Sequence, residues 1–156
     1  MMVKNPEIFS LVKGASEGNT KLNSFDNALL NAGVGDTNLV RMSSIIPPNC
    51  ELVDEIILPK GALIPIAYAA ISSENPGETI SAAIGVGLPE NPGEPGLIME
   101  FEDIRPLSYV EEVVRQMVVD GYKFRNRKYR EILTLGIEHK VEKTASVFAA
   151  AVLWYK

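Results

Sequence analysis

Alternation of apolar and polar residues predicts that most of this chain forms β-strands. The predicted strands cover residues 7–12, 37–42, 51–58, 62–72, 79–88, 96–102, 133–141 and the C-terminal segment "TASVFAAAVLWY". Gly- and Pro-rich turns such as "NPGE" and "PENPGEPG" separate several of them. The segments 62–72 and 79–88 are rich in small apolar residues, which is typical of strands that are covered on both faces.

Two segments have helical character. In "NSFDNALLNAG", Asn23 or Ser24 is a candidate N-cap and Gly33 a candidate end signal. In "PLSYVEEVVRQMVVDGYKF", Ser108 and Glu111 have the spacing of a capping box, and Gly121 is expected to end the helix. The second segment also carries an apolar stripe at helical spacing, made by Val110, Val113, Val114, Met117 and Val118. Many strands with two helices predict an α+β sandwich.

Length and composition fit a single globular domain over residues 1–156. Hydrophobic residues make up 46% and charged residues 22% of the chain. The apolar runs are shorter than a membrane span of about 20 residues, and the N-terminus lacks the pattern of a signal peptide, so we expect a soluble, cytoplasmic protein with no membrane partner. The net charge of −5 argues against nucleic acid as a partner. The basic run Lys123 to Arg130 is interpreted as a solvated connection rather than a nucleic-acid patch.

The single cysteine and the single histidine offer little chemistry. Cys50 excludes an intrachain disulfide and a multi-cysteine metal site, and a thiol nucleophile would need a base beside it. His139 is expected on the apolar face of the strand at 133–141, as a hydrogen-bonded core or interface residue. We therefore expect neither a zinc site nor a serine triad.

Two adjacent serines, Ser43 and Ser44, lie where the strand at 37–42 meets a turn containing Pro47 and Pro48. If the backbone is distorted there and a donor stabilises the oxyanion, the Ser44 hydroxyl can attack the Ser43 carbonyl and turn the peptide into an ester. Elimination and hydrolysis would then break the chain and leave a pyruvoyl group at position 44. Its ketone would act as an electrophile and electron acceptor, as pyridoxal phosphate does. A serine pair before a turn is common, and it also fits a plain strand end.

Longer motifs around the serine pair resemble the pyruvoyl-dependent arginine decarboxylases over nearly the whole chain. They are "GASEG" at 14–18, "LNSFDNALLNAGVGDTNLVRMSSIIPP" at 22–48, "PGETISAAIGV" at 76–86, "GLIMEFE" at 96–102 and "VEKTASVFAAAVLWYK" at 141–156. The resemblance implies conversion of L-arginine to agmatine and carbon dioxide through a Schiff base on a pyruvoyl group formed from Ser44. It implies no metal and no pyridoxal phosphate.

The resemblance also implies a role for each matching residue. Ser43 and Ser44 would flank the cleaved bond, and Ser43 would also contact the substrate. Asn38 would stabilise the oxyanion during cleavage, and Glu100 would act as an acid near the pyruvoyl group. Asp26 would receive the substrate guanidinium, whose fork of donors suits a carboxylate. From their residue types alone, Asp26 fits a surface or capping position, Asn38 an edge or turn, and Glu100 a solvated strand face.

The fold implied by the resemblance is a four-layer αββα sandwich of the pyruvoyl-dependent histidine/arginine decarboxylase type. The implied assembly is a homotrimer of protomers cleaved into 1–43 and 44–156, with active sites between subunits. Two alternatives remain open. One is a pyruvoyl-dependent decarboxylase for ornithine, lysine or histidine, since Asp26 indicates a cation without distinguishing guanidinium from ammonium. The other is an unprocessed, non-catalytic paralogue.

Overall fold

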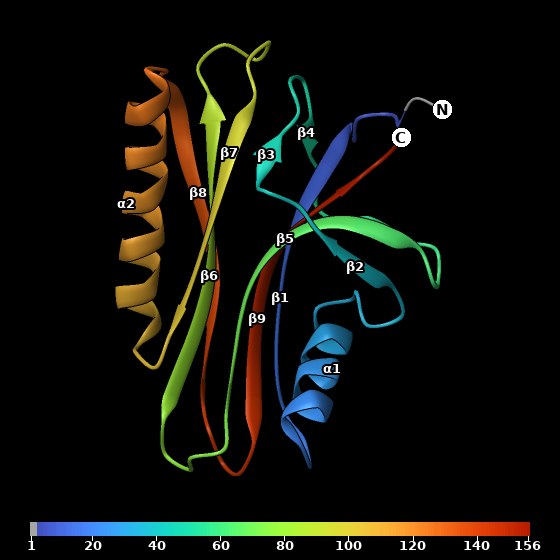
Figure 1. Ribbon diagram of the computed structural model, residues 1–156, viewed down its shortest axis with the longest axis vertical. Coiled ribbons are helices and arrows are strands. Elements are labelled where there is room, and N and C mark those ends of the chain that lie inside the picture. The colour runs from blue at the N-terminus through green and yellow to red at the C-terminus, as the bar shows by residue number, and fades with distance from the viewer. Residues whose placement is uncertain (1–2) are drawn as a thin grey trace.

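Two β-sheets lie face to face, and one helix covers the outer side of each (Figure 1). The computed structural model describes residues 3–156. Its elements are β1 (Ile8–Glu17), α1 (Lys21–Asn31), β2 (Asn38–Arg41), β3 (Ile45–Ile46), β4 (Glu51–Leu52), β5 (Leu63–Ser73), β6 (Thr79–Pro89), β7 (Gly96–Asp103), α2 (Leu107–Arg125), β8 (Tyr129–Lys140) and β9 (Ala145–Trp154). The expected α+β fold, a four-layer αββα sandwich, is confirmed.

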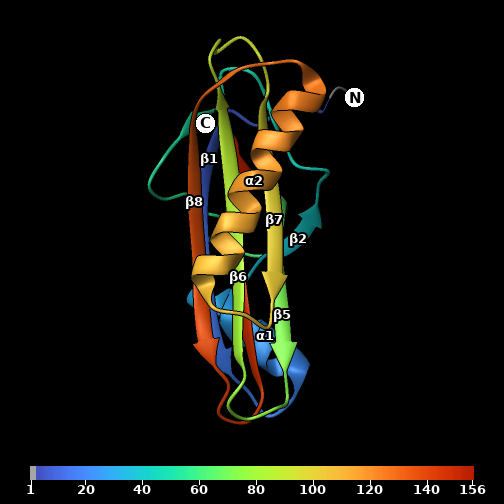
Figure 2. The same cartoon turned by 90° about the vertical axis from the view of Figure 1, so that its left-hand side faces the viewer.

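The strand order explains why two strands are buried along their length. The five-stranded sheet has the order β2-β5-β9-β1-β4, and the four-stranded sheet has the order β3-β7-β6-β8. Strands β9 and β6 occupy the interiors of their sheets, and nearly every residue in each is buried. Helix α2 lies lengthwise over the outer face of β6, β7 and β8 (Figure 2). Strands that are covered on both faces were predicted from their small apolar residues, and β6 shows that pattern most clearly.

Helix α1 begins earlier than its sequence suggests. Thr20 is the N-cap, because its hydroxyl accepts a hydrogen bond from the Asn23 amide at 3.1 Å. The prediction of Asn23 or Ser24 as the cap is therefore wrong. Ser24 is fully buried, and its hydroxyl lies 2.6 Å from that of Ser146 in β9. Gly33 follows the helix end with φ +85°, which agrees with its predicted role as an end signal.

Helix α2 also differs from prediction at both ends. Pro106 precedes its first turn and no side chain caps it from within the helix, so the capping box of Ser108 and Glu111 is not formed. Instead, the Leu107 amide donates to a carboxylate oxygen of Glu138 in β8, at 3.3 Å. The helix continues through Gly121 to Arg125, where Asn126 adopts a left-handed conformation.

Gly121 serves close packing rather than helix termination. A Cβ there would lie 2.3 Å from Cδ2 of Leu97 in β7, so glycine lets the helix approach the sheet.

Two strands of the structure have other limits than those predicted. Strand β1 extends to Glu17, beyond the predicted strand at 7–12, because it pairs with β9 as far as Ala145. Of the predicted strand 51–58, only β4 forms.

No helix in residues 3–156 is long and apolar enough to cross a membrane.

Close contact between β1 and α1 predicts that Gly14→Ala destabilises the protein. A Cβ at Gly14 would lie 2.1 Å from the backbone carbonyl oxygen of Ala28, which cannot move without shifting the helix. Overpacking of this kind costs about 1–3 kcal/mol. We expect a lower urea midpoint at fixed protein concentration. The matched control is Gly93→Ala in the β6–β7 loop, where the nearest atom is a side-chain oxygen at 3.3 Å. Equal midpoints for the two variants would contradict this packing argument.

Candidate active site

The backbone at Ser44 is held in an unfavourable conformation. Its φ is +80°, in a region of backbone conformation that residues other than glycine rarely adopt. The strain arises where the chain leaves β2 in the five-stranded sheet and enters β3 in the four-stranded sheet. Hydrogen bonds fix both sides of this crossing: the Met42 amide donates to the Ile66 carbonyl at 3.0 Å, and the Ile98 amide donates to the Ser44 carbonyl at 2.9 Å. Such a residue stores about 1–3 kcal/mol of strain.

The side chain of Ser44 is buried and contacts a carboxylate. Only 8% of the residue is exposed. Its hydroxyl donates to Oε2 of Glu100 at 3.1 Å. Glu100 belongs to β7, where its neighbours Met99 and Phe101 pack against α2 on the other face. Because side chains alternate along a strand, Glu100 is directed toward the space between the sheets, where Ser44 lies.

Arg41 completes this group of side chains. Its Nη2 atom lies 3.5 Å from Oε1 of Glu100 and donates to the Tyr68 carbonyl at 2.9 Å. The guanidinium also stacks on the Tyr68 ring, 4.4 Å from its centroid. Arg41 and Tyr68 were not singled out from the sequence, because their contacts join residues that are far apart in the chain.

Glu102 is a second carboxylate on the strand of Glu100 and was not singled out from the sequence. It shares the face of Glu100 because the two residues are two positions apart on β7. Partial removal from water raises the pKa of Glu102. The charge of Arg41 opposes this shift, whereas Glu100 adds to it. Alternating carboxylates beside an apolar strand face were the signal in the sequence for this acidic pair.

Other predicted site residues are not brought to Ser44 within one chain. Asn38 is exposed. Its side-chain amide donates to the Gly61 carbonyl at 3.0 Å rather than to Ser43 or Ser44. The side chain of Ser43 is exposed. Asp26 is exposed on α1, which packs against the five-stranded sheet, whereas Glu100 belongs to the other sheet. The predicted roles of Asn38, Ser43 and Asp26 remain predictions.

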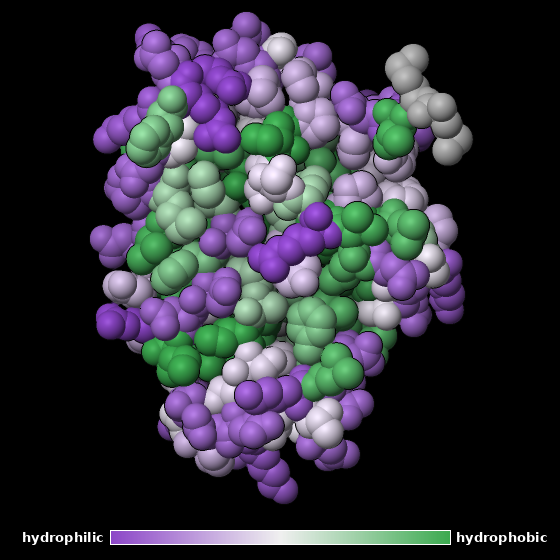
Figure 3. Space-filling model, in the orientation of Figure 1, coloured by the Kyte–Doolittle hydropathy of each residue, from purple (hydrophilic) through white to green (hydrophobic). Residues whose placement is uncertain are grey.

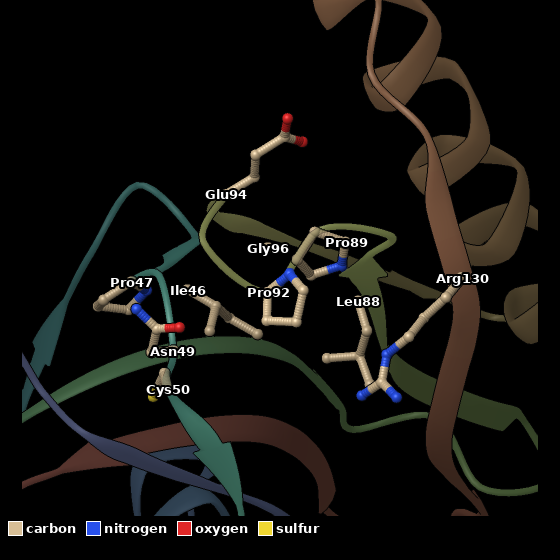
Figure 4. A pocket seen from close by; sticks show the side chains of 10 residues that line it. All are labelled: Ile46, Pro47, Asn49, Cys50, Leu88, Pro89, Pro92, Glu94, Gly96 and Arg130. Carbon is tan, nitrogen blue, oxygen red and sulfur yellow. The ribbon is translucent and has the colours of Figure 1, made fainter.

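Cys50 and His139 have surroundings that suit structural roles. Cys50 lines a pocket with Asn49 and Pro92, and the Arg130 side chain reaches into the same region beside Leu88 (Figure 4). Burial raises the pKa of the Cys50 thiol to about 11, so the reactive thiolate is scarce at neutral pH.

His139 is hydrogen-bonded, as expected: its Nε2 lies 2.6 Å from Oε2 of Glu17, at the end of β1. The same carboxylate accepts the backbone amides of Glu142 and Lys143, at 3.2 and 2.8 Å. The pair therefore ties the β8–β9 turn to β1. Residues 3–156 contain no cluster of three or more His, Cys, Asp or Glu side chains that could hold a metal ion.

Comparisons with known proteins identify the family of this chain. The family model described as pyruvoyl-dependent arginine decarboxylase matches residues 8–155. A protein of that name from Methanocaldococcus jannaschii is 51% identical over 153 residues, which cover 98% of this chain and 93% of the relative. Relatives of the same name from Pyrococcus abyssi and Methanococcus maripaludis (strain C5) are 47% and 42% identical, covering 96% and 97% of this chain and 96% and 92% of the relatives. This chain therefore belongs to the pyruvoyl-dependent arginine decarboxylase family.

Proposed function

We propose that this protein is a self-processing decarboxylase that converts L-arginine to agmatine and carbon dioxide with a pyruvoyl group derived from Ser44. The observation that carries the proposal is the strained, buried Ser44, whose hydroxyl is held by Glu100 at 3.1 Å. A serine that merely ended a strand would need neither the strain nor the carboxylate. Family membership supplies the chemical class, and the strained backbone and buried hydroxyl of Ser44 support the proposal that this chemistry occurs there.

In the proposed self-cleavage the Ser44 hydroxyl is the nucleophile. Its oxygen attacks the Ser43 carbonyl carbon, the C–N bond between the two residues breaks, and an ester replaces the amide. Elimination then breaks the bond between Cβ and Oγ of Ser44, so that oxygen leaves as part of a new carboxylate on Ser43. Hydrolysis of the remaining unsaturated residue releases ammonia and leaves the keto group. The residues present fit this route, since the strain at Ser44 is relieved when the chain separates into 1–43 and 44–156.

The pyruvoyl group supplies an electrophilic carbonyl that takes up an amine and accepts the electrons released with carbon dioxide. The protein must then return a proton to the substrate α-carbon, and Glu100 is the acid that lies beside position 44. Its side chain is only 22% exposed, so bulk water has limited access to that carboxyl. Asn38 is assigned to oxyanion stabilisation during cleavage, and Ser43 to substrate contact. Both assignments rest on the matching motif.

Asp26 would act on a site in a neighbouring subunit. Helix α1, which carries Asp26, packs against β1, β9 and β5 and belongs to the other side of the sandwich from Glu100, so Asp26 would reach a substrate at Ser44 only through assembly. A homotrimer with active sites between subunits would supply it. Support comes from apolar side chains exposed near the crossing, including Leu63, Val40 and Ile45, which are 69%, 49% and 37% exposed. Figure 3 shows hydrophobic residues surrounding a small hydrophilic group on this face of the molecule.

The cleavage route predicts that Ser44→Ala leaves the chain whole, because no hydroxyl remains to attack. The matched control is Ser43→Ala, which keeps the carbonyl that is attacked and should still be cleaved. A denaturing gel and mass spectrometry of the purified proteins distinguish the fragments 1–43 and 44–156 from the intact chain. Cleavage of the Ser44→Ala variant at the same bond would refute the route. A wild-type protein that stays intact would instead favour a non-catalytic paralogue.

The assignment of Asp26 as the partner of the guanidinium predicts that the enzyme prefers L-arginine and that replacing Asp26 weakens arginine binding. Carbon dioxide release should be faster with L-arginine than with ornithine, lysine or histidine. Replacing Asp26 with Asn removes a charge-assisted contact of about 1.5–3 kcal/mol, so KM for arginine should rise about 10- to 100-fold with a smaller effect on kcat. Asp36→Asn, at another exposed position, is the control. An unchanged KM in the Asp26 variant would show that the guanidinium binds elsewhere. Faster carbon dioxide release from ornithine, lysine or histidine would show that the wild-type protein is a decarboxylase for that amino acid instead of arginine.

A further inference from the structure

We propose that Arg41 is the residue that positions Glu100 once the chain has been cleaved. This inference rests on the proposed function, because it concerns the acid that serves the decarboxylation. Arg41 is a positioning residue in this account: it acts through the carboxylate of Glu100 and not on the substrate itself.

Cleavage removes one of the two contacts that hold Glu100 in the intact chain. The carboxylate has Ser44 at one oxygen, at 3.1 Å, and Arg41 at the other, at 3.5 Å. The cleavage reaction transfers the Ser44 hydroxyl oxygen to the new carboxylate of Ser43, so that contact ends when the protein matures. Among the hydrogen bonds and ion pairs of residues 3–156, the contact with Arg41 is the one that remains. The mature enzyme therefore depends on Arg41 to keep its acid in place.

Arg41 is itself well anchored for this role. Strand β2 ends at Arg41, and the last ladder bond to β5 is made by the Met42 amide and the Ile66 carbonyl. Beyond that point the edge of β5 is open, and the guanidinium donates to the Tyr68 carbonyl at 2.9 Å. The Tyr68 ring, on which the guanidinium stacks, packs in turn against Phe148 at a centroid distance of 5.3 Å. A planar guanidinium can stack and donate at the same time, which a lysine ammonium does less well.

The contact also joins the two fragments of the mature protein. Arg41 lies in 1–43 and Glu100 in 44–156, so their ion pair would bridge the cleaved bond two residues from the new chain end. Cleavage adds the negative charge of the Ser43 carboxylate to a site that already contains Glu100 and Glu102. Among the described residues, Arg41 is the cation in contact with this acidic group, and it offsets the repulsion that would otherwise move Glu100 away.

A displaced Glu100 should have a specific chemical consequence. If the acid no longer faces the substrate α-carbon, the proton can go to the carbon at position 44 instead. Hydrolysis would then release an aldehyde, the substrate nitrogen would stay on the protein, and the long fragment would begin with alanine. Each such event consumes one keto group. The fraction of long fragment with N-terminal alanine therefore reports where the proton was delivered, which general loss of stability would not change.

The test compares Arg41→Gln and Arg41→Lys with the wild type and with Arg130→Gln, which changes an exposed arginine at the start of β8. Cleavage is followed by gel, kcat and KM by agmatine release, and N-terminal alanine by mass spectrometry after a fixed number of turnovers. We expect cleavage in both Arg41 variants. In Arg41→Gln, kcat should fall about tenfold or more while KM changes less than about threefold, and N-terminal alanine should accumulate. Arg41→Lys should be intermediate, and Arg130→Gln should match the wild type.

Two results would overturn the inference. Wild-type kcat and no excess alanine in a cleaved Arg41→Gln would show that Glu100 keeps its position without Arg41. Folded Arg41→Gln and Arg41→Lys proteins that both stay uncleaved would show that Arg41 acts on the precursor instead. A wild-type protein that neither cleaves nor releases agmatine would be a failure of the proposed function, and the Arg41 variants would play no part in that conclusion.

Discussion

The crossing of the chain from one sheet to the other at Ser44 is the constraint on which the site depends. Both sides of the crossing are fixed, by β2 pairing with β5 and by β3 pairing with β7. The linking residues must span the space between the sheets, and Ser44 takes a left-handed backbone as a result. The same crossing buries its hydroxyl against Glu100. Strain and positioning thus have one origin, which is the connection between the two layers.

The fold explains how the protein would stay together if the proposed cleavage broke the peptide bond between Ser43 and Ser44. Strand β1, in the short fragment, pairs with β9 from Ile8 to Glu17 and also with β4. Helix α1 packs on β1 and β9, so the fragment 1–43 contributes an interior strand and an outer layer. The proposed cleavage would therefore relieve local strain without separating the core. The ion pair of Arg41 with Glu100 would then be a polar contact between the two proposed fragments.

The sequence predicted the layers better than the details of the site. Small apolar residues in 79–88 identified a strand covered on both faces, and the helical stripe of α2 identified its buried side. Gly121 was misjudged because its function is close approach to Leu97, which depends on tertiary packing. The cap of α2 was missed for the same reason, since it comes from Glu138 on another strand.

Within the site, the motif identified Ser44 and Glu100, but only the three-dimensional arrangement placed them in contact and brought Arg41 and Tyr68 beside them. The central claim is that this contact marks a bond that breaks and leaves a carbonyl at residue 44. The direct test treats the purified protein with phenylhydrazine, which reacts with carbonyl groups, and then analyses the fragments by mass spectrometry. The account predicts one labelled carbonyl per protomer, on the N-terminal residue of fragment 44–156. A long fragment with a free amine and no labelled carbonyl would contradict it.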